Sequence, residues 1–100
     1  MALAQGVLTE TRRTLYRAPH GGAIVNSITL VNYSSGTGTL GTTFNLYEVR
    51  SSKSPIKIAP INTNCDVGDS YVDYTRRVLS EGDEIQGDAL DGGVVEFTIN

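Results

Sequence analysis

Short runs of β-branched and aromatic residues, separated by turn-forming residues, recur about every ten positions and constrain the fold more than any other feature of this sequence. The longest run, residues 23–33, has apolar side chains on both parities, which predicts a strand that is buried on both faces or broken by a bulge near Asn26. The last run alternates cleanly, and Val95, Phe97 and Ile99 are expected to point inward. About seven or eight such strands predict an all-β fold, an antiparallel, jelly-roll-like β-sandwich.

Two segments depart from the simplest strand pattern. In residues 42–50, Phe44 and Leu46 are expected inward, but the apolar residues that follow take the other parity, which predicts that the strand twists or changes face. Residues 72–85 could also be drawn as a helix, but Gly82 and the β-branched residues favour strands joined by a turn. Neither segment changes the all-β prediction.

The length of 100 residues is typical of one domain, which is expected to be a flexible N-terminal arm over residues 1–13 and a β-domain over residues 14–100. Hydrophobic content of 39% and a net charge of −3 indicate a globular chain rather than a disordered one. The acid excess argues against a nucleic acid partner, and no apolar run approaches the roughly 20 residues of a membrane helix. Cys65 is the only cysteine, so no disulfide can form within the chain.

The run His20-Gly21-Gly22 raises the question of catalysis, because a His-Gly-Gly run can form part of an oxyanion hole. That function needs a nucleophile elbow of the G-x-S-x-G type and a separate histidine base, whereas His20 is the only histidine in a chain without that motif. Two glycines suit the positive φ angles of a tight turn, which predicts a turn from Pro19 to Gly22. The sequence therefore predicts a protein that is not an enzyme.

Acidic side chains gather in the last third of the chain and could bind calcium through their carboxylates. The residues considered for this site are Asp66, Asp69, Asp83, Glu84, Asp88 and Asp91. None follows the spacing of a calcium-binding loop, and turn residues are the simpler interpretation. Paired carboxylates could also act on sugars, but the chain has no Trp that would stack against a sugar ring. We expect no metal and no cofactor.

Arginine residues are the candidates for contact with a partner. Two adjacent pairs of arginines could bind phosphate or carboxylate groups, or could pair with the acidic surface of a neighbouring subunit. The acid excess of the chain favours the protein partner, and Tyr offers an apolar ring with a polar tip at such contacts. The predicted contact residues are Arg12, Arg13, Arg17, Tyr16, Arg76 and Arg77.

The segment TLYRAPHGGAIVNSITLVNYSS, residues 14–35, resembles the opening of small β-sandwich proteins that tailed bacteriophages build into their virions. The resemblance continues through the turn LSEGDEI at residues 79–85 and the closing strand at residues 94–99. It spans nearly the whole chain, but its motifs are strand edges and turns, so no catalytic residue is carried over. Members of this group are mostly capsid decoration (cement) proteins and small tail, neck or fibre-associated proteins.

The resemblance implies a non-enzymatic virion protein that is made in the host bacterial cytoplasm. The leading expectation is a capsid decoration protein that binds the major capsid protein as a homo-oligomer, either a dimer or a trimer. The N-terminal arm would lie across a neighbour and pair with an exposed sheet edge. Two alternatives stay open: a neck, tail or fibre-attachment component with the same fold, and a receptor- or glycan-binding module. No membrane partner is expected.

Overall fold

The part of the chain that the structure describes, residues 2–33, 42–50, 53–90 and 94–100, folds entirely into antiparallel β-sheet and turns, without a helix. The structure is a computed structural model, and its described residues contain eleven strands. These are β1 (Ala4–Val7), β2 (Arg13–Arg17), β3 (Ala23–Val25), β4 (Ile28–Asn32), β5 (Thr42–Val49), β6 (Ile56–Lys57), β7 (Thr63–Cys65), β8 (Ser70–Asp73), β9 (Arg77–Leu79), β10 (Glu84–Ala89) and β11 (Val95–Ile99). The all-β prediction is confirmed, and the additional strands are mostly runs of two or three residues.

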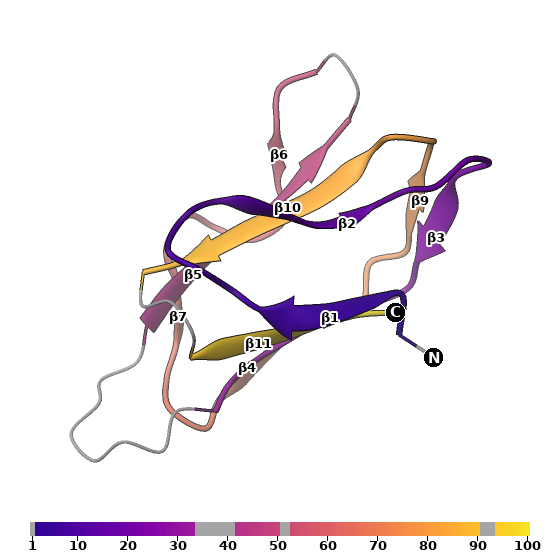
Figure 1. Cartoon of the computed structure of the whole chain (residues 1–100). Coiled ribbons are helices and arrows are strands. Elements are labelled where there is room, and N and C mark those ends of the chain that lie inside the picture. Colours follow the sequence, from indigo (N-terminus) through magenta and orange to yellow (C-terminus); the bar gives the residue numbers. More distant parts are fainter. Residues whose placement is uncertain (1, 34–41, 51–52, 91–93) are drawn as a thin grey trace.

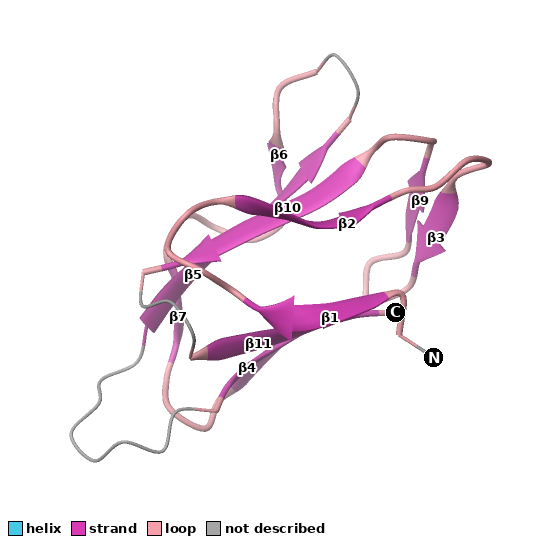
Figure 2. Cartoon of the chain, viewed as in Figure 1, coloured by secondary structure: helices cyan, strands magenta, loops and turns pink. Residues whose placement is uncertain are grey.

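The strands form two larger sheets and one two-stranded ribbon (Figure 1). Sheet A has the order β1-β11-β4-β8, and sheet B has the order β2-β10-β5-β6, with β7 also paired to β5. Strands β3 and β9 make the ribbon, which lies at one end of the molecule (Figure 2). The ribbon joins the two larger sheets, because β3 connects β2 to β4 and β9 connects β8 to β10.

The strand pairs are nested along the chain. Strand β1 pairs with β11, β2 with β10, β3 with β9 and β4 with β8, and β5 pairs with both β6 and β7. Two further pairs, β10 with β5 and β11 with β4, join the nested pairs into the two larger sheets. The chain is therefore one long antiparallel hairpin whose successive strand pairs lie in sheet A, sheet B, the β3–β9 ribbon, sheet A again and sheet B again.

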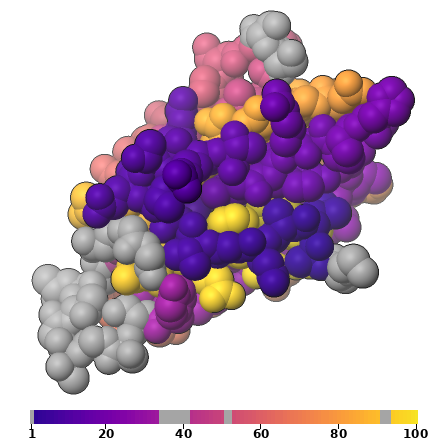
Figure 3. All heavy atoms as spheres, viewed as in Figure 1, coloured from indigo at the N-terminus to yellow at the C-terminus, as the bar shows by residue number. Residues whose placement is uncertain are grey.

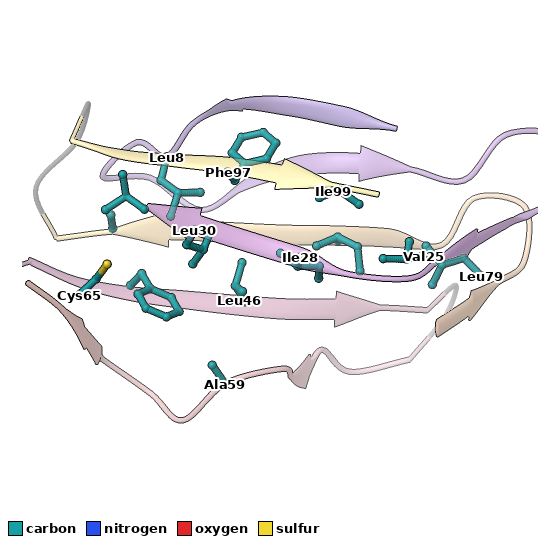
Figure 4. Packing of buried hydrophobic residues seen from close by; sticks show 14 of the residues in the cluster. Leu8, Val25, Ile28, Leu30, Leu46, Ala59, Cys65, Leu79, Phe97 and Ile99 are labelled. Carbon is teal, nitrogen blue, oxygen red and sulfur yellow. The ribbon is translucent and has the colours of Figure 1, made fainter. Parts of the chain in front are cut away.

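Buried side chains from both larger sheets and from the ribbon form one hydrophobic core (Figure 4). The inward positions of β11, Val95, Phe97 and Ile99, are buried as the alternation predicted. Phe44 and Leu46 of β5 are fully buried as well, and the Phe44 ring lies 5.1 Å from the Tyr71 ring of β8 in sheet A. Apolar burial of this kind is the main favourable contribution to folding.

The long run at residues 23–33 is broken where the sequence indicated. It forms β3 and β4, separated by Asn26 and Ser27. The backbone N–H groups of both residues donate to the carbonyl oxygen of Asn100, at distances of 2.6 and 3.2 Å, and this replaces the ladder bonds lost at the break. The break lets the chain leave the ribbon and enter sheet A. The segment at residues 72–85 likewise forms strands, joined by a turn at Gly82 with φ +85°.

The expectation of a flexible arm over residues 1–13 is corrected by the structure. Residues Ala4–Val7 form β1, which pairs along its whole length with β11, and Leu8 is fully buried in the core. Gly6 lies directly over Phe97, since a Cβ placed there would come within 3.1 Å of the ring. Figure 3 shows the N-terminal segment against the C-terminal strand. Within this segment, β1 is an edge strand of sheet A and Leu8 is part of the core.

Candidate functional site

Five charged side chains from β5, β8, β9 and the adjoining turns form one ion-pair network. Arg77 lies 2.9 Å from Asp73 and 3.5 Å from Glu48, measured between nitrogen and oxygen. Arg50 lies 2.9 Å from Glu48 and 3.6 Å from Asp83. The three carboxylates are almost fully buried, and the Arg77 side chain is 15% exposed. The network ties both larger sheets to the ribbon.

Hydrogen bonds favour the charged form of the Asp73 carboxyl. Burial acts to raise the pKa of Asp73, but the Thr75 backbone N–H and the Arg77 guanidinium donate to it and leave that pKa below its ordinary value. The Asp83 carboxylate accepts from the Ser80 backbone N–H at 2.9 Å. Every charge thus has an opposite charge within reach, which is the arrangement that allows ionised groups to be buried.

The structure contradicts the predicted change of face in β5, and the network explains why. Buried and half-buried positions alternate along the whole strand, so Glu48 keeps the inward parity of Phe44 and Leu46. A carboxylate can occupy this inward position because Arg50 and Arg77 compensate its charge. Tyr47 and Val49 therefore point outward together with the polar residues of the strand.

The His20-Gly21-Gly22 run forms the turn that the sequence predicts. The Gly22 N–H donates to the Pro19 carbonyl oxygen at 2.8 Å, and the two glycines have φ of +89° and +84°. The His20 side chain is 98% exposed, and its Nδ1 lies 2.7 Å from the Glu81 carboxylate. This contact connects the turn at residues 19–22 to the turn at residues 80–83, at the tip of the ribbon.

Cys65 lies at the other end of the core, away from the Val25 and Leu79 end that adjoins the ribbon (Figure 4). Its side chain is buried, and burial raises the pKa of the thiol above 9.0. The Asn32 side chain donates to the Cys65 carbonyl oxygen at 2.9 Å, which fixes β7 against β4. Cys65 and His20 are thus separated and have different partners.

The acidic residues considered for calcium are dispersed among separate environments. Asp83 belongs to the ion-pair network, Glu84 pairs with Arg17 on β2, and Asp88 accepts from Asn45 at 2.9 Å. Asp66 and Asp69 lie in the turn between β7 and β8, and Asp91 lies outside the described residues. Among the residues that the structure places, no three His, Cys, Asp or Glu side chains are grouped so as to hold a metal ion. The placed part of the chain also has no helix that is long and apolar enough to cross a membrane.

The outer face of sheet B is polar. Outward positions on its strands carry Arg17, Lys57, Glu84 and Asp88, and hydrogen bonds from Thr14 and Gln86 reach Glu84. These bonds lower the pKa of the Glu84 carboxyl from its ordinary value. A hollow of about 450 Å³ opens at one end of this face. It is lined by Glu10, Thr43, Asn45, Asn62, Asp88, Ala89 and Leu90.

The outer face of sheet A, in contrast, is nearly free of charge. Strand register and exposure place eight residues on it: Gln5, Val7, Thr29, Val31, Ser70, Val72, Glu96 and Thr98. Only Glu96 is charged, and Val7, Val31 and Val72 are all substantially exposed. Interface cores are depleted in charged residues, and exposed apolar patches mark contact surfaces. This face is the candidate functional surface.

The predicted contact residues divide into exposed and inward-pointing side chains. Arg12 lies over the Tyr47 ring at 5.0 Å from its centroid, and Arg13 and Arg17 are exposed on β2. Tyr16 packs against the core, and Arg77 belongs to the ion-pair network. Arg76 is exposed just before β9, whereas Arg77 is held in the network, so the two do not act as a pair.

The sequence reasoning missed both the outer face of sheet A and the ion-pair network. A signal for the network was present, since Glu48 continues the inward parity that Phe44 and Leu46 begin. The outer face of sheet A depends on the register of four strands that are far apart in the chain.

Comparison with protein-family models gives no match for this chain, and neither curated proteins nor solved structures match it. The function is therefore inferred from the surfaces of the molecule.

Proposed function

We propose that this chain is a non-enzymatic structural protein of a tailed-phage virion, a capsid decoration protein that binds major capsid subunits through the outer face of sheet A. The observation that carries the proposal is the charge contrast between the two larger sheets. Sheet A presents valine, threonine and serine side chains with a single carboxylate, whereas sheet B presents a hydrogen-bonded polar surface. A molecule with one face that carries few charges and one polar face is suited to lie on a particle with the polar face toward solvent.

The strand order supports a jelly-roll sandwich as the scaffold of this role. Nested antiparallel pairs with the orders β1-β11-β4-β8 and β2-β10-β5-β6 are what a long hairpin rolled into two sheets produces. Double-sheet jelly rolls occur in viral capsid and lectin domains. Strand β1, within the segment expected as an arm, contributes Gln5 and Val7 to the proposed contact face.

The placement of the reactive side chains supports a non-enzymatic role. A nucleophile and its base must lie within hydrogen-bond reach of one another. His20 is paired with Glu81 at an exposed tip, and Cys65 is buried at the other end of the core with its thiol neutral. The ionised groups that are buried compensate one another in the ion-pair network and hold the sheets together.

Binding to purified heads that lack the chain tests the proposal. Val31→Lys together with Val72→Lys places two charged side chains on the contact face, and we expect binding to weaken by at least about 100-fold, because charges are costly to remove from water when an interface forms. Val49→Lys makes the same exchange on the outer face of sheet B and should leave binding unchanged. Co-sedimentation with heads gives the affinity, and thermal unfolding shows that all variants are folded. Full binding by the doubly substituted protein would overturn the proposal.

A neck, tail or fibre-attachment role uses the same scaffold with another partner. Copy number separates it from decoration, since a decoration protein is present in many copies per head and a neck or tail component in a few or a dozen. Densitometry of purified particles against the major capsid protein gives this number.

The second candidate is a glycan- or receptor-binding module, and the hollow at the end of sheet B favours it. Glu10 and Asp88 offer carboxylate oxygens there and Asn62 an amide, the groups that bind sugar hydroxyls. Host-cell binding by the isolated protein that is lost in Asp88→Ala and retained with Val31→Lys would favour this function over decoration.

A further inference from the structure

The β3–β9 ribbon exposes an apolar pair that the fold does not need. Ile24 and Val78 lie directly opposite one another in its register and are 44% and 61% exposed. Their neighbours Val25 and Leu79 point to the other side of the ribbon and are buried in the core. The core of the molecule therefore covers one side of the ribbon, whereas the other side exposes two large aliphatic side chains to solvent.

A hollow of about 470 Å³ lies against this pair. It is lined by Gly21, Gly22, Ala23, Ile24, Val78 and Leu79. The lining is made of small and aliphatic residues. Hollows that are lined in this way accept apolar side chains of a partner.

Opposite charges flank the apolar pair at the two ends of the ribbon. Arg76 is exposed at the end where β9 begins. Glu81 lies in the turn beyond the other end of β9, and its side chain is 63% exposed. The order along β9 and its flanking residues is therefore cation, apolar pair, carboxylate, and the carboxylate also lies 2.7 Å from His20 Nδ1.

We propose that this ribbon surface docks a second copy of the same chain across a two-fold axis that passes beside Ile24 and Val78. A surface with a cation at one end and a carboxylate at the other is complementary to itself when rotated by half a turn. Arg76 of each copy then faces Glu81 of the other, and the two apolar pairs meet at the centre. The inference deepens the proposed function, on which it rests for its biological setting, by naming how decorating copies contact each other.

The contact is small and is therefore expected to be concentration-dependent in solution. Stable dimers bury about 800 Å² on each partner, more than a short two-stranded ribbon and its turns offer. On a particle, copies held at neighbouring sites meet at a high effective concentration, so a weak contact contributes there. The ribbon lies at the end of the molecule rather than on the outer face of sheet A, so both surfaces can be occupied at once (Figure 1).

Sedimentation equilibrium of the full chain over a wide concentration range tests the inference. Arg76→Glu and Glu81→Arg each place like charges opposite one another, and we expect each to weaken dimerisation by about tenfold or more. An equimolar mixture of these two variants restores both opposite-charge pairs, so a heterodimer should form as readily as the wild-type dimer. Lys57→Glu reverses a cation on the outer face of sheet B and should dimerise like wild type. Thermal unfolding verifies that each variant is folded.

Each contrary result overturns the inference. It fails if the wild type stays monomeric at all concentrations, if both single variants dimerise like wild type, or if their mixture does not recover association. The head-binding test with Val31→Lys and Val72→Lys addresses a different face. Loss of dimerisation with intact head binding would reject the ribbon contact alone, whereas dimerisation without head binding would reject the proposed function alone.

Discussion

Replacement of Arg77 by Met is expected to lower the free energy of unfolding by about 3 kcal/mol, because it removes the compensating charge of the buried Asp73 carboxylate and one of the two cations beside Glu48. The guanidinium lies 2.9 Å from Asp73 and 3.5 Å from Glu48, and both carboxylate side chains are less than 10% exposed. Met retains the length and apolar character of the Arg stem, so the effect reports mainly on the lost charge. Urea unfolding at neutral pH measures it.

Arg76→Met is the matched control, since the same substitution at the exposed neighbour should change stability by less than about 0.5 kcal/mol. The pH dependence provides a second check. Asp73 has a pKa below its ordinary value of 3.8, so its contribution is present above that value and is lost as the pH falls through the lower pKa of the folded protein. The difference between wild type and Arg77→Met should therefore shrink below about pH 3.8. Equal losses from both Met variants would contradict the network.

Replacement of Gly22 by Ala is expected to cost about 3 kcal/mol of stability, because positive φ and a backbone clash act together. Gly22 has φ +84°, and a Cβ built on it would lie well inside contact distance of the Leu79 carbonyl oxygen. That oxygen belongs to the ribbon backbone and cannot move without disturbing the pairing of β3 with β9. Thermal or urea unfolding of the two proteins measures the difference.

Gly21→Ala separates the two causes. Gly21 has φ +89°, but a Cβ there would meet nothing within 4 Å, so only the conformational cost of about 1 kcal/mol is expected. A loss at Gly21 as large as at Gly22 would show that the close approach to Leu79 is not what fixes this turn. The comparison reports directly on the turn that the His-Gly-Gly run forms.

Local patterns predicted the parts of the fold that local chemistry determines. The alternation of Val95, Phe97 and Ile99 specifies the inward face of β11, and two adjacent glycines specify the turn that ends at Gly22. The mixed parity of residues 23–33 marked the break between β3 and β4. Each of these depends on neighbours in the sequence, so periodicity and turn chemistry are sufficient.

Non-local pairing accounts for what the sequence did not predict. The segment AQGV has little β propensity, and it becomes a strand because the edge of β11 at the far end of the chain accepts it and Gly6 fits over Phe97. Glu48 stays inward because Arg77, from another strand, compensates its charge. Periodicity assigns neither partner.

The candidate surfaces also contain some features that local sequence predicts and others that depend on non-local pairing. The sequence predicted both Arg76 and Arg77 as contact residues and did not distinguish them, whereas the structure places the Arg77 side chain in the ion-pair network. The outer face of sheet A, with Glu96 as its one charged strand residue, is formed only when β1, β11, β4 and β8 are placed side by side. Its valines come from three strands that are far apart in the chain.

A cryo-EM reconstruction of heads saturated with the purified protein tests whether the outer face of sheet A lies against the capsid shell, as we propose. We expect ordered density for the domain at regular sites, with β1, β11, β4 and β8 toward the shell and the outer face of sheet B toward solvent. Heads without such density, or a bound domain whose sheet A faces solvent, would contradict it.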